Sequence, residues 1–441
     1  MSDRQNRQNR QEGLASRRAA YRVLRRVHAH GMWASPAVDA AIGNLAPRDR
    51  SFAANLAFET LRWEGTLDWA LDHVLKRPDV EDGVRDVLRL GAWQLAYGQT
   101  PPHAAVATAV EVARAEVGQR ATGFVNGVLR ALARRWEELP WPDEATTEGL
   151  ALATGYAPWI VAEARARFGG DARAVLEAGN VAPGVTLRAD GDPDALVAEL
   201  VEAGIPAQRG TLAAGAVRAP GAVPGSLPSV AEGRATPQDE ASMLVVEALL
   251  TAAPEAELVY DVCSAPGGKA THLAARGRRV LAGDRLESRA RLTAELAGRL
   301  GSEVWVITAD GTAPPVAEGR LEAVLLDVPC TGLGVVRRRP ELRWRREAGD
   351  PAELARLQSR LLDAAVPLLR PGGILCYSAC TWTVAETTAV VDAAIRRHPT
   401  LRALPTDLGA HWTPPGGPGT MLRPDLDGTD GMYVALLVRD A

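Results

Sequence analysis

From about residue 238 to the C-terminus, short β-rich runs alternate with longer helical stretches, and this alternation constrains the fold more than any other feature. The expected strands are Leu258–Val262, Arg279–Asp284, Val304–Asp310, Ala323–Asp327, Ile374–Ser378 and Tyr433–Val438. The expected helices between them include Leu286–Leu300, Ala352–Leu369 and Val384–Arg397. Strands that alternate with helices in this way predict a parallel sheet that is covered on both faces.

A glycine-containing turn, Asp261-Val-Cys-Ser-Ala-Pro-Gly-Gly-Lys269, follows the first expected strand and leads into a helix. It is not a phosphate-binding P-loop, because Cys263 replaces the first glycine and Ala270 replaces the hydroxyl residue, and it does not match GxGxxG. Adjacent glycines still let the backbone approach a ligand at a helix N-terminus. Lys269 is one of only two lysines in the chain, and a compact ammonium is not interchangeable with a guanidinium in a tight space.

Carboxylates follow three successive expected strands, at Asp261, Asp284 and Asp310. Asp284 is placed to accept hydrogen bonds from a ribose, and Asp310 could frame an adenine edge. Each carboxylate taken alone is more often a helix cap than a ligand, but three at successive strand ends reverse this and favour a ligand site. An adenosine with a small positive group, rather than a polyphosphate, suits this set, and S-adenosylmethionine meets that description.

Two cysteines, Cys330 and Cys380, each close an apolar run near the C-terminal end of the chain. Ligands of a doubly wound sheet sit outside the carboxyl ends of the strands, so both thiols are expected to face one crevice. Paired thiols beside a cofactor turn indicate covalent chemistry. Cys263 and Cys376 are expected to be small buried side chains. The four cysteines form no CxxC pair and no disulfide framework, so we expect no metal and a reducing cytoplasm.

The first part of the chain, from about 14 to 136, shows helical spacing without strand-like alternation, which predicts an all-α bundle. The Pro-rich stretch Leu139–Pro142 is a candidate linker. Residues from about 150 to 240 mix the expected helices Trp159–Phe168 and Ala195–Ala203 with short apolar runs, which fits a small α+β unit.

The net charge of −4 argues against a nucleic-acid binder on average, but the distribution is uneven. Residues 1–30 hold eight arginines against two acids, and residues 337–346 hold six arginines against one. These runs either bind phosphates or are solvated faces, and Trp344 either stacks on a base or packs against the body. No run is apolar and long enough to span a bilayer, and the N-terminus lacks the apolar core of a signal peptide.

The motifs resemble those of the RNA cytosine-5 methyltransferases, in particular the bacterial 16S ribosomal RNA enzymes of the RsmB (Fmu or Sun) type. The matching stretches are Cys263–Lys269, Asp327-Val-Pro-Cys330-Thr-Gly-Leu-Gly334, Ser378-Ala-Cys380-Thr, Pro237–Ser242 and Asp427–Gly431. Three N-terminal stretches, Leu88–Leu95, Pro102–Val106 and Gly123–Arg130, resemble the NusB-like RNA-binding domain. Ala379 stands where the family often has Thr, and Thr387 or Thr388 where it often has Asn.

The resemblance implies a multidomain protein. Its expected parts are a disordered basic tail over 1–13, a NusB-like all-α bundle over 14–138, a small α+β RNA-recognition or linking domain over 146–237, and a Rossmann-like class I methyltransferase over 238–441. It also implies that S-adenosylmethionine methylates carbon 5 of an unpaired cytosine in 16S rRNA, naked or within a small-subunit assembly particle. The expected protein is a cytoplasmic monomer.

The same resemblance assigns roles to residues. Cys380 becomes the nucleophile that adds to carbon 6 of the ring, Asp327 the group at N3 that supplies or holds a proton, and Cys330 the group that helps to remove the carbon-5 proton or release the product. The expected cofactor residues are Cys263, Ser264, Ala265, Pro266, Gly267, Gly268, Lys269, Asp284, Arg289, Asp310 and Asp327. The alternatives are an inactive RNA-binding or ribosome-assembly factor and a tRNA cytosine-5 methyltransferase.

Overall fold

The computed structural model describes residues 3–415 and 417–440, and the chain divides into two compact units. The first unit contains the chain up to Asn180 together with Arg338–Glu347. The second contains Val181–Arg337 and the chain from Ala348 onward. Among the described helices, none combines the length and the apolarity that a membrane crossing requires.

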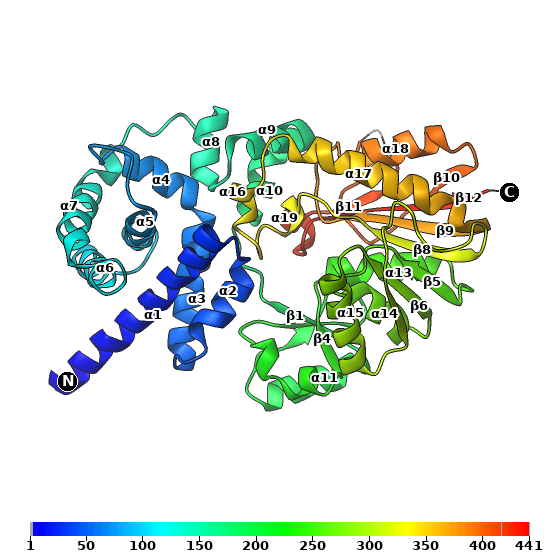
Figure 1. Ribbon diagram of the computed structural model, residues 1–441, viewed down its shortest axis with the longest axis horizontal. Coiled ribbons are helices and arrows are strands. Elements are labelled where there is room, and N and C mark those ends of the chain that lie inside the picture. Colours follow the sequence, from blue (N-terminus) through cyan, green and yellow to red (C-terminus); the bar gives the residue numbers. More distant parts are fainter. Residues whose placement is uncertain (1–2, 416, 441) are drawn as a thin grey trace. The chain divides into compact units, whose positions relative to one another are not determined.

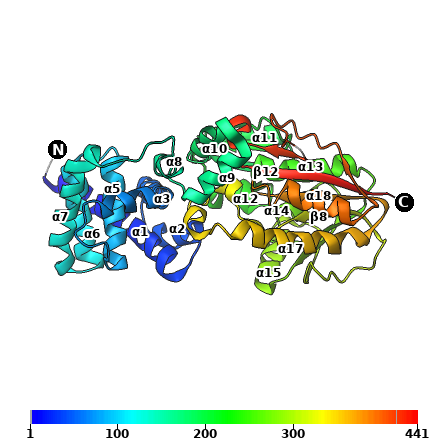
Figure 2. The ribbon, with the colours of Figure 1, turned by 90° about the horizontal axis from the view of Figure 1, so that it is seen from above.

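The first unit is helical throughout its described residues, as the sequence predicts for its first part, and α5, α6 and α7 pack against one another as a bundle (Figure 2). Its first helices are α1 (Asp3–His30), α2 (Ala34–Ile42), α3 (Pro47–Arg62), α4 (Glu64–Asp72), α5 (Asp82–Ala96), α6 (Pro102–Glu116) and α7 (Gln119–Arg135). Because α1 begins at Asp3, the expectation of a disordered tail over residues 1–13 is wrong from Asp3 onward. Residues 1 and 2 lie outside the described part.

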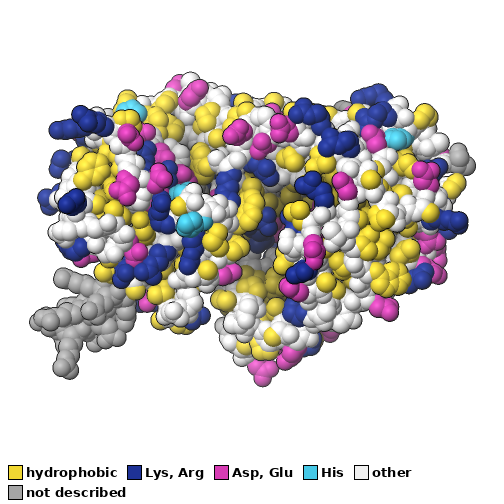
Figure 3. Space-filling view, viewed as in Figure 1, with side chains coloured by type: hydrophobic (Ala, Val, Ile, Leu, Met, Phe, Trp, Pro, Cys, Tyr) yellow, Lys and Arg dark blue, Asp and Glu magenta, His cyan; other side chains and the backbone are white. Residues whose placement is uncertain are grey.

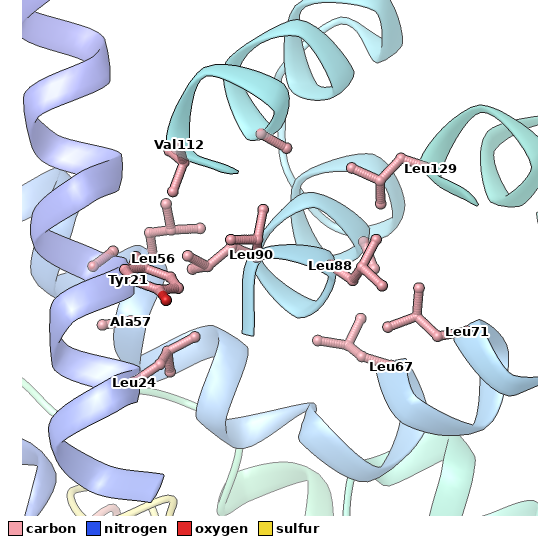
Figure 4. Close-up of a cluster of buried hydrophobic side chains, with 14 of the residues drawn as sticks. Tyr21, Leu24, Leu56, Ala57, Leu67, Leu71, Leu88, Leu90, Val112 and Leu129 are labelled. Carbon is pink, nitrogen blue, oxygen red and sulfur yellow. The ribbon is translucent and has the colours of Figure 1, made fainter. Parts of the chain in front are cut away.

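Buried aliphatic side chains hold this bundle together. The side chains labelled in Figure 4 come from α1 and from α3 to α7, point toward a common interior and are all buried. The labelled residues are Tyr21, Leu24, Leu56, Ala57, Leu67, Leu71, Leu88, Leu90, Val112 and Leu129. Burial of this apolar surface, rather than helix propensity, supplies most of the stability of such helices.

The chain between the bundle and Asn180 also belongs to the first unit, in α8 (Thr147–Thr154), α9 (Pro158–Phe168) and α10 (Ala172–Ala178). The expected linker Leu139–Pro142 is packed rather than loose, since Leu139 is buried and Trp141 lies 4.5 Å from the ring of Trp69. The Thr66 hydroxyl donates to the Leu152 carbonyl and so ties α8 to α4. The segment expected to form one α+β domain over 146–237 is therefore divided at Asn180.

Residues Arg338–Glu347, with the short helix α16 (Leu342–Arg345), belong to the first unit although their sequence neighbours belong to the second. We call this segment the strap. Its Arg343 is fully buried and donates to the carbonyls of Gly155 and Gly179 and to the Asn180 side chain. The guanidinium also lies 3.7 Å from the centre of the Tyr156 ring. Burial lowers the pKa of Arg343, because a cation is less stable away from water than in it.

Other strap residues are held in the same way. The Trp344 indole donates to the Leu61 carbonyl at 2.6 Å, and its ring fills the space that a Cβ would need at Gly65. Arg345 donates to the carbonyls of Val27, Gly31 and Met32. The hypothesis that residues 337–346 are a solvated or phosphate-binding run is thus wrong for Arg343, whose two terminal nitrogens donate inside the protein. Trp344 packs against the body.

The second unit begins with a small sheet in which β1 (Val185–Ala189) pairs antiparallel with β3 (Ala216–Ala219) and β4 (Ala235–Pro237). The strand order is β2-β3-β1-β4, with β2 at Gln208–Arg209. Helices α11 (Pro193–Glu202) and α12 (Pro228–Ala231) connect these strands. Leu187, Leu196 and Val217 form the centre of its small apolar core.

The main sheet carries the predicted alternation. The described strands have the order β10-β12-β9-β8-β5-β6-β7, and β11 pairs with β12. They are β5 (Leu258–Asp261), β6 (Arg279–Asp284), β7 (Val304–Thr308), β8 (Leu321–Asp327), β9 (Leu369–Ala379), β10 (Leu401–Leu404), β11 (Thr420–Leu422) and β12 (Met432–Arg439). Figure 1 shows helices α13 (Glu240–Ala252), α14 (Gly268–Ala275) and α15 (Glu287–Leu300) on one face, and α17 (Asp350–Ala365) and α18 (Thr388–Arg397) on the other.

Strands β5 to β9 are parallel, as predicted, but β12 runs antiparallel to β9 and also to β10 and β11. The sheet is therefore mixed, and the expectation of a wholly parallel sheet is wrong at this edge. Strands β10 and β11 were not expected, because short runs such as Leu401–Leu404 give little periodic signal. On the face shown in Figure 3, cationic and anionic side chains are interspersed, in keeping with a net charge of −4.

Replacement of Arg343 by Met should destabilise the first unit by about 2–4 kcal/mol, because buried carbonyls that accept from the guanidinium lose their donor. The measurement is urea unfolding followed by tryptophan fluorescence. The control is Arg339→Ala, since Arg339 is exposed and lies 5.6 Å above the Trp33 ring; a change of less than about 1 kcal/mol is expected. Equal stabilities of the two variants would contradict this account of the strap.

Candidate active site

The glycine turn connects β5 to α14, as the sequence predicts. Gly267, the residue before α14, has a φ of +103°, and a Cβ there would lie 3.0 Å from the Cα of Thr293. A side chain at this position would therefore be both strained and crowded. Ser264 of the same turn is buried, and its amide donates to the Gly283 carbonyl at 2.8 Å. The turn is thus fixed against β6 and α15.

Asp284 lies at the end of β6 and is buried, with both carboxylate oxygens in hydrogen bonds. One oxygen accepts from the Leu286 amide at 3.0 Å, and the other accepts from Arg289 at 3.1 Å. Arg289 also donates to the Ala265 carbonyl, so it joins the glycine turn to the end of β6. Asp310 is exposed beyond the end of β7, and Thr312 donates to it, which lowers its pKa.

Lys269, on the first turn of α14, lies among acidic groups. Its ammonium donates to Asp327 at 2.6 Å. Burial lowers the pKa of Lys269, but the neighbouring Asp327 and the more distant Cys380 and Asp261 more than offset this and keep it protonated. The side chain of Lys269 is only 11% exposed, which agrees with the prediction that a compact ammonium is needed where space is tight.

Asp261, at the end of β5, is a buried carboxyl group whose two oxygens have no well-formed hydrogen bond among the described residues. Burial raises the pKa of Asp261 to about 8, and the charge of Asp327 adds to that effect. Lys269 and, more weakly, the Cys263 amide oppose it. A buried carboxyl without strong donors is costly for a structural residue, and this favours a ligand-binding role.

The register of β8 against β9 brings the two cysteines together. Asp327 and Ser378 are opposite each other in this parallel pair, and the Ser378 hydroxyl donates to Asp327 at 2.7 Å. Cys330 lies three residues beyond Asp327, and Cys380 two residues beyond Ser378. Their sulfur atoms are 3.1 Å apart, and both residues are partly exposed. The two thiols therefore lie next to each other, as the sequence predicts.

The cysteines differ in environment. The hydrogen bond with Cys380, together with burial and nearby Glu386 and Asp327, raises the pKa of Cys330 far above its usual range. Cys330 is thus held as a thiol at neutral pH. Burial also raises the pKa of Cys263 and of Cys376. Cys376 is fully buried within β9, as expected of a structural side chain.

The loops that carry the cysteines are fixed by backbone contacts. The Gly334 amide donates to the Cys380 carbonyl at 3.0 Å, and the Gly431 amide donates to the Gly334 carbonyl at 2.8 Å. A Cβ at Gly334 would lie 2.0 Å from the Gly431 carbonyl oxygen, so only glycine fits there. Asp239 accepts from the amide of Asp430, which brings the stretch at 237–242 to the same place.

Arg188, which lies on β1, is not among the residues predicted from the sequence. Its buried guanidinium donates to the Gly268 carbonyl at 2.8 Å and to the Gln238 side chain at 2.7 Å, so the small sheet supports the glycine turn directly. Glu386 was also missed; its buried carboxylate accepts from the amide of Thr331. A charged residue within an apolar strand is a signal that could have identified Arg188. Nothing local identifies Glu386.

The described residues thus place a buried carboxyl, an ammonium–carboxylate pair and two thiols at the carboxyl ends of β5, β8 and β9. Such a set can bind a cationic ligand, hold a proton at Asp327 and form a covalent bond through sulfur.

Two family models match the chain. The model described as 16S rRNA methyltransferase RsmB/F matches residues 248–438, and the model of the NusB family matches residues 14–134. A protein of Mycobacterium tuberculosis H37Rv, provisionally described as a methyltransferase, is 38% identical over 96% of each chain. Ribosomal RNA small subunit methyltransferase B of Xanthomonas campestris is 36% identical over 97% of this chain and 98% of its own.

The fold also matches solved structures. The crystal structure of PH0851 covers 97% of this chain and 98% of its own, with a TM-score of 0.82 and 20% identity. NSun6 from Pyrococcus horikoshii, solved with SFG, has a TM-score of 0.56 and 20% identity, and covers 64% of this chain and 98% of its own. At these identities the likeness concerns the fold.

Replacement of Asp261 by Asn should remove a pH dependence of stability. The pKa of Asp261 is about 8 in the folded protein against an ordinary value of 3.8, so the folded state binds the proton more tightly. Its contribution is full below the ordinary value and is lost as pH rises toward the folded pKa. The measurement is the difference in unfolding free energy between wild type and variant from about pH 5 to about pH 8. Parallel curves would contradict the assignment.

Proposed function

Because the chain belongs to the RsmB/F family of 16S rRNA methyltransferases, we propose that it methylates carbon 5 of an unpaired cytosine in 16S rRNA through a covalent adduct on Cys380. It is an RNA methyltransferase, and its cofactor is S-adenosylmethionine. The observation that carries the proposal is the distance of 3.1 Å between the sulfurs of Cys330 and Cys380, close to the Lys269–Asp327 pair.

The glycine turn and the carboxylates beside it fit this cofactor. Each oxygen of Asp284, at the end of β6, accepts one hydrogen bond and still has a lone pair that can accept from a ribose hydroxyl. Asp261 has no well-formed hydrogen bond and gains a partner when a cationic group lies beside it, which would lower its pKa again. When bound, the cofactor supplies an electrophilic methyl group. We assign its binding to Cys263–Lys269, Asp284, Arg289, Asp310 and Asp327.

The chain's own residues supply the activation of the base. Carbon 5 of cytosine is a poor nucleophile, and addition of the Cys380 thiolate to carbon 6 makes it electron-rich. A new sulfur–carbon bond forms while the displaced electron pair moves into the ring, and Asp327 holds or supplies the proton that N3 then takes up. Lys269 and Ser378 fix the orientation of Asp327 by donating to its two oxygens.

Release of the product reverses the addition. A base accepts the carbon-5 proton, and the electron pair of that carbon–hydrogen bond restores the double bond between carbons 5 and 6. The electron pair of the bond between sulfur and carbon 6 returns to the Cys380 sulfur, and N3 gives its proton back to Asp327. We assign Cys330 to this step, because its thiol lies next to the departing Cys380 sulfur and its raised pKa keeps the thiol protonated as a donor. The base must be unstacked to reach the site, so the substrate is a looped or single-stranded region. We place a monomer of the enzyme, with its RNA or assembly particle, in the cytoplasm.

The Cys380→Ala variant should lose methyl transfer to unmodified small-subunit RNA by at least about a thousandfold, because nothing replaces its covalent step. The assay is tritium transfer from labelled cofactor. Cys330→Ala should instead accumulate a protein–RNA adduct that survives denaturing electrophoresis. The control is Cys376→Ala, which removes a buried thiol of β9. Full activity of Cys380→Ala would overturn the nucleophile, and transfer to tRNA alone would overturn the substrate.

A further inference from the structure

Glu386 lies behind the two cysteine loops as a fully buried carboxylate between β9 and α18. One of its oxygens accepts from the Thr331 amide at 2.8 Å and from the Gln358 side chain at 3.2 Å. The other accepts from the hydroxyls of Thr331 at 2.6 Å and Thr383 at 2.8 Å. With the Thr381 hydroxyl at 3.4 Å, five donors therefore converge on one carboxylate. Burial raises the pKa of Glu386, and the donors from Thr331, Thr383 and Gln358 oppose that rise and favour the ionised form.

These donors include residues adjacent to both cysteines. Thr331 follows Cys330, and Thr381 follows Cys380. The hydroxyls of Thr331 and Thr381 are 2.8 Å apart, and the Thr381 hydroxyl lies 3.4 Å from Glu386. Glu386 therefore connects the residue after one thiol to the residue after the other.

Pro329, the residue before Cys330, is bound by the same hydrogen-bond network. Gln358, on α17, donates to the Pro329 carbonyl at 3.0 Å and to Glu386. Tyr377 donates to the backbone carbonyl of Glu386 at 2.7 Å and so fixes the carboxylate's own segment to β9. Cys330 thus lies between two residues whose backbones are tied, directly or through Gln358, to Glu386.

We propose that Glu386 is a positioning residue that holds the loops of Cys330 and Cys380 at a fixed separation, so that both sulfurs act on the same pyrimidine ring. Its carboxylate does not touch the substrate. The inference rests on the proposed function for its purpose, but the separation of the sulfurs is a property of the protein alone. Its negative charge has a second effect, because it disfavours a thiolate at Cys330 and leaves the anionic role to Cys380.

Three substitutions separate the two effects. Glu386→Ala removes both the charge and the acceptors. Glu386→Gln removes the charge but keeps an acceptor for the Thr331 amide, and the neighbouring hydroxyls can turn to accept from its amide group. Thr331→Val keeps the backbone amide and the shape of the side chain, and removes only the hydroxyl between Glu386 and Thr381.

Two controls are matched to these variants. Thr383→Val also removes a hydroxyl that donates to Glu386, but residue 383 is not next to a cysteine. Glu247→Gln makes the same charge change at a half-buried position of α13, where burial raises the pKa of the carboxyl.

The first measurement uses the free protein without RNA or cofactor. Diamide takes two electrons and two protons from the two thiols and is reduced to its hydrazine, and mass spectrometry follows the resulting disulfide between Cys330 and Cys380. Closure should be fast in the wild type, because the sulfurs are 3.1 Å apart. Closure should slow at least about tenfold in Glu386→Ala and Thr331→Val, because a thiol pair held less closely meets less often. Both controls and Glu386→Gln should close no more slowly than the wild type.

The second measurement is alkylation of Cys330 by iodoacetamide at neutral pH, which should be faster in Glu386→Gln than in Glu247→Gln because only the former loses a charge near that thiol. Wild-type closure rates in both Glu386→Ala and Thr331→Val would overturn the positioning role. If Glu386→Ala does not fold, Thr331→Val against Thr383→Val decides alone. A failure of the proposed function would appear separately, as absence of any RNA adduct in Cys330→Ala.

Discussion

The parallel pairing of β8 with β9 is the constraint on which the candidate active site depends. It sets Asp327 opposite Ser378, and the loops that follow these strands then begin side by side. The sulfurs of Cys330 and Cys380 consequently lie 3.1 Å apart although 50 residues separate them in sequence. A shift of this register by one residue would turn the side chains of β9 to the opposite face and separate Asp327 from Ser378.

The charge of Lys269 acts on two carboxyl groups of the site. Its ammonium donates a hydrogen bond to Asp327 and, from a longer distance, lowers the pKa of Asp261. Asp261 is left with a raised pKa and no well-formed hydrogen bond, a state that a cationic ligand relieves. At Cys330 the hydrogen bond with Cys380 and burial, with smaller contributions from nearby anionic groups, raise the pKa and keep the thiol protonated beside the sulfur proposed to be the nucleophile.

Some arginines of this chain act as buried hydrogen-bond donors rather than as surface charges. The guanidiniums of Arg188 and Arg343 are buried and donate to backbone carbonyls, one beneath the glycine turn and one within the strap. A planar group with five donors can satisfy several carbonyls at once, which an ammonium on a flexible stem does less well. A cluster of arginines in a sequence is for this reason no direct measure of a phosphate-binding surface.

The sequence by itself determined the helical first part, the five parallel strands β5 to β9, the turn that ends at Lys269 and the residues that follow each strand. These are local signals, since periodicity, glycine spacing and strand ends are written in neighbouring residues. Only the tertiary structure decided the reversed direction of β12, the assignment of α8–α10 and the strap to the first unit, and the convergence on Glu386. Each of these depends on partners far apart along the chain, and their pairing is selected by burial and hydrogen bonding in the folded protein rather than by local pattern.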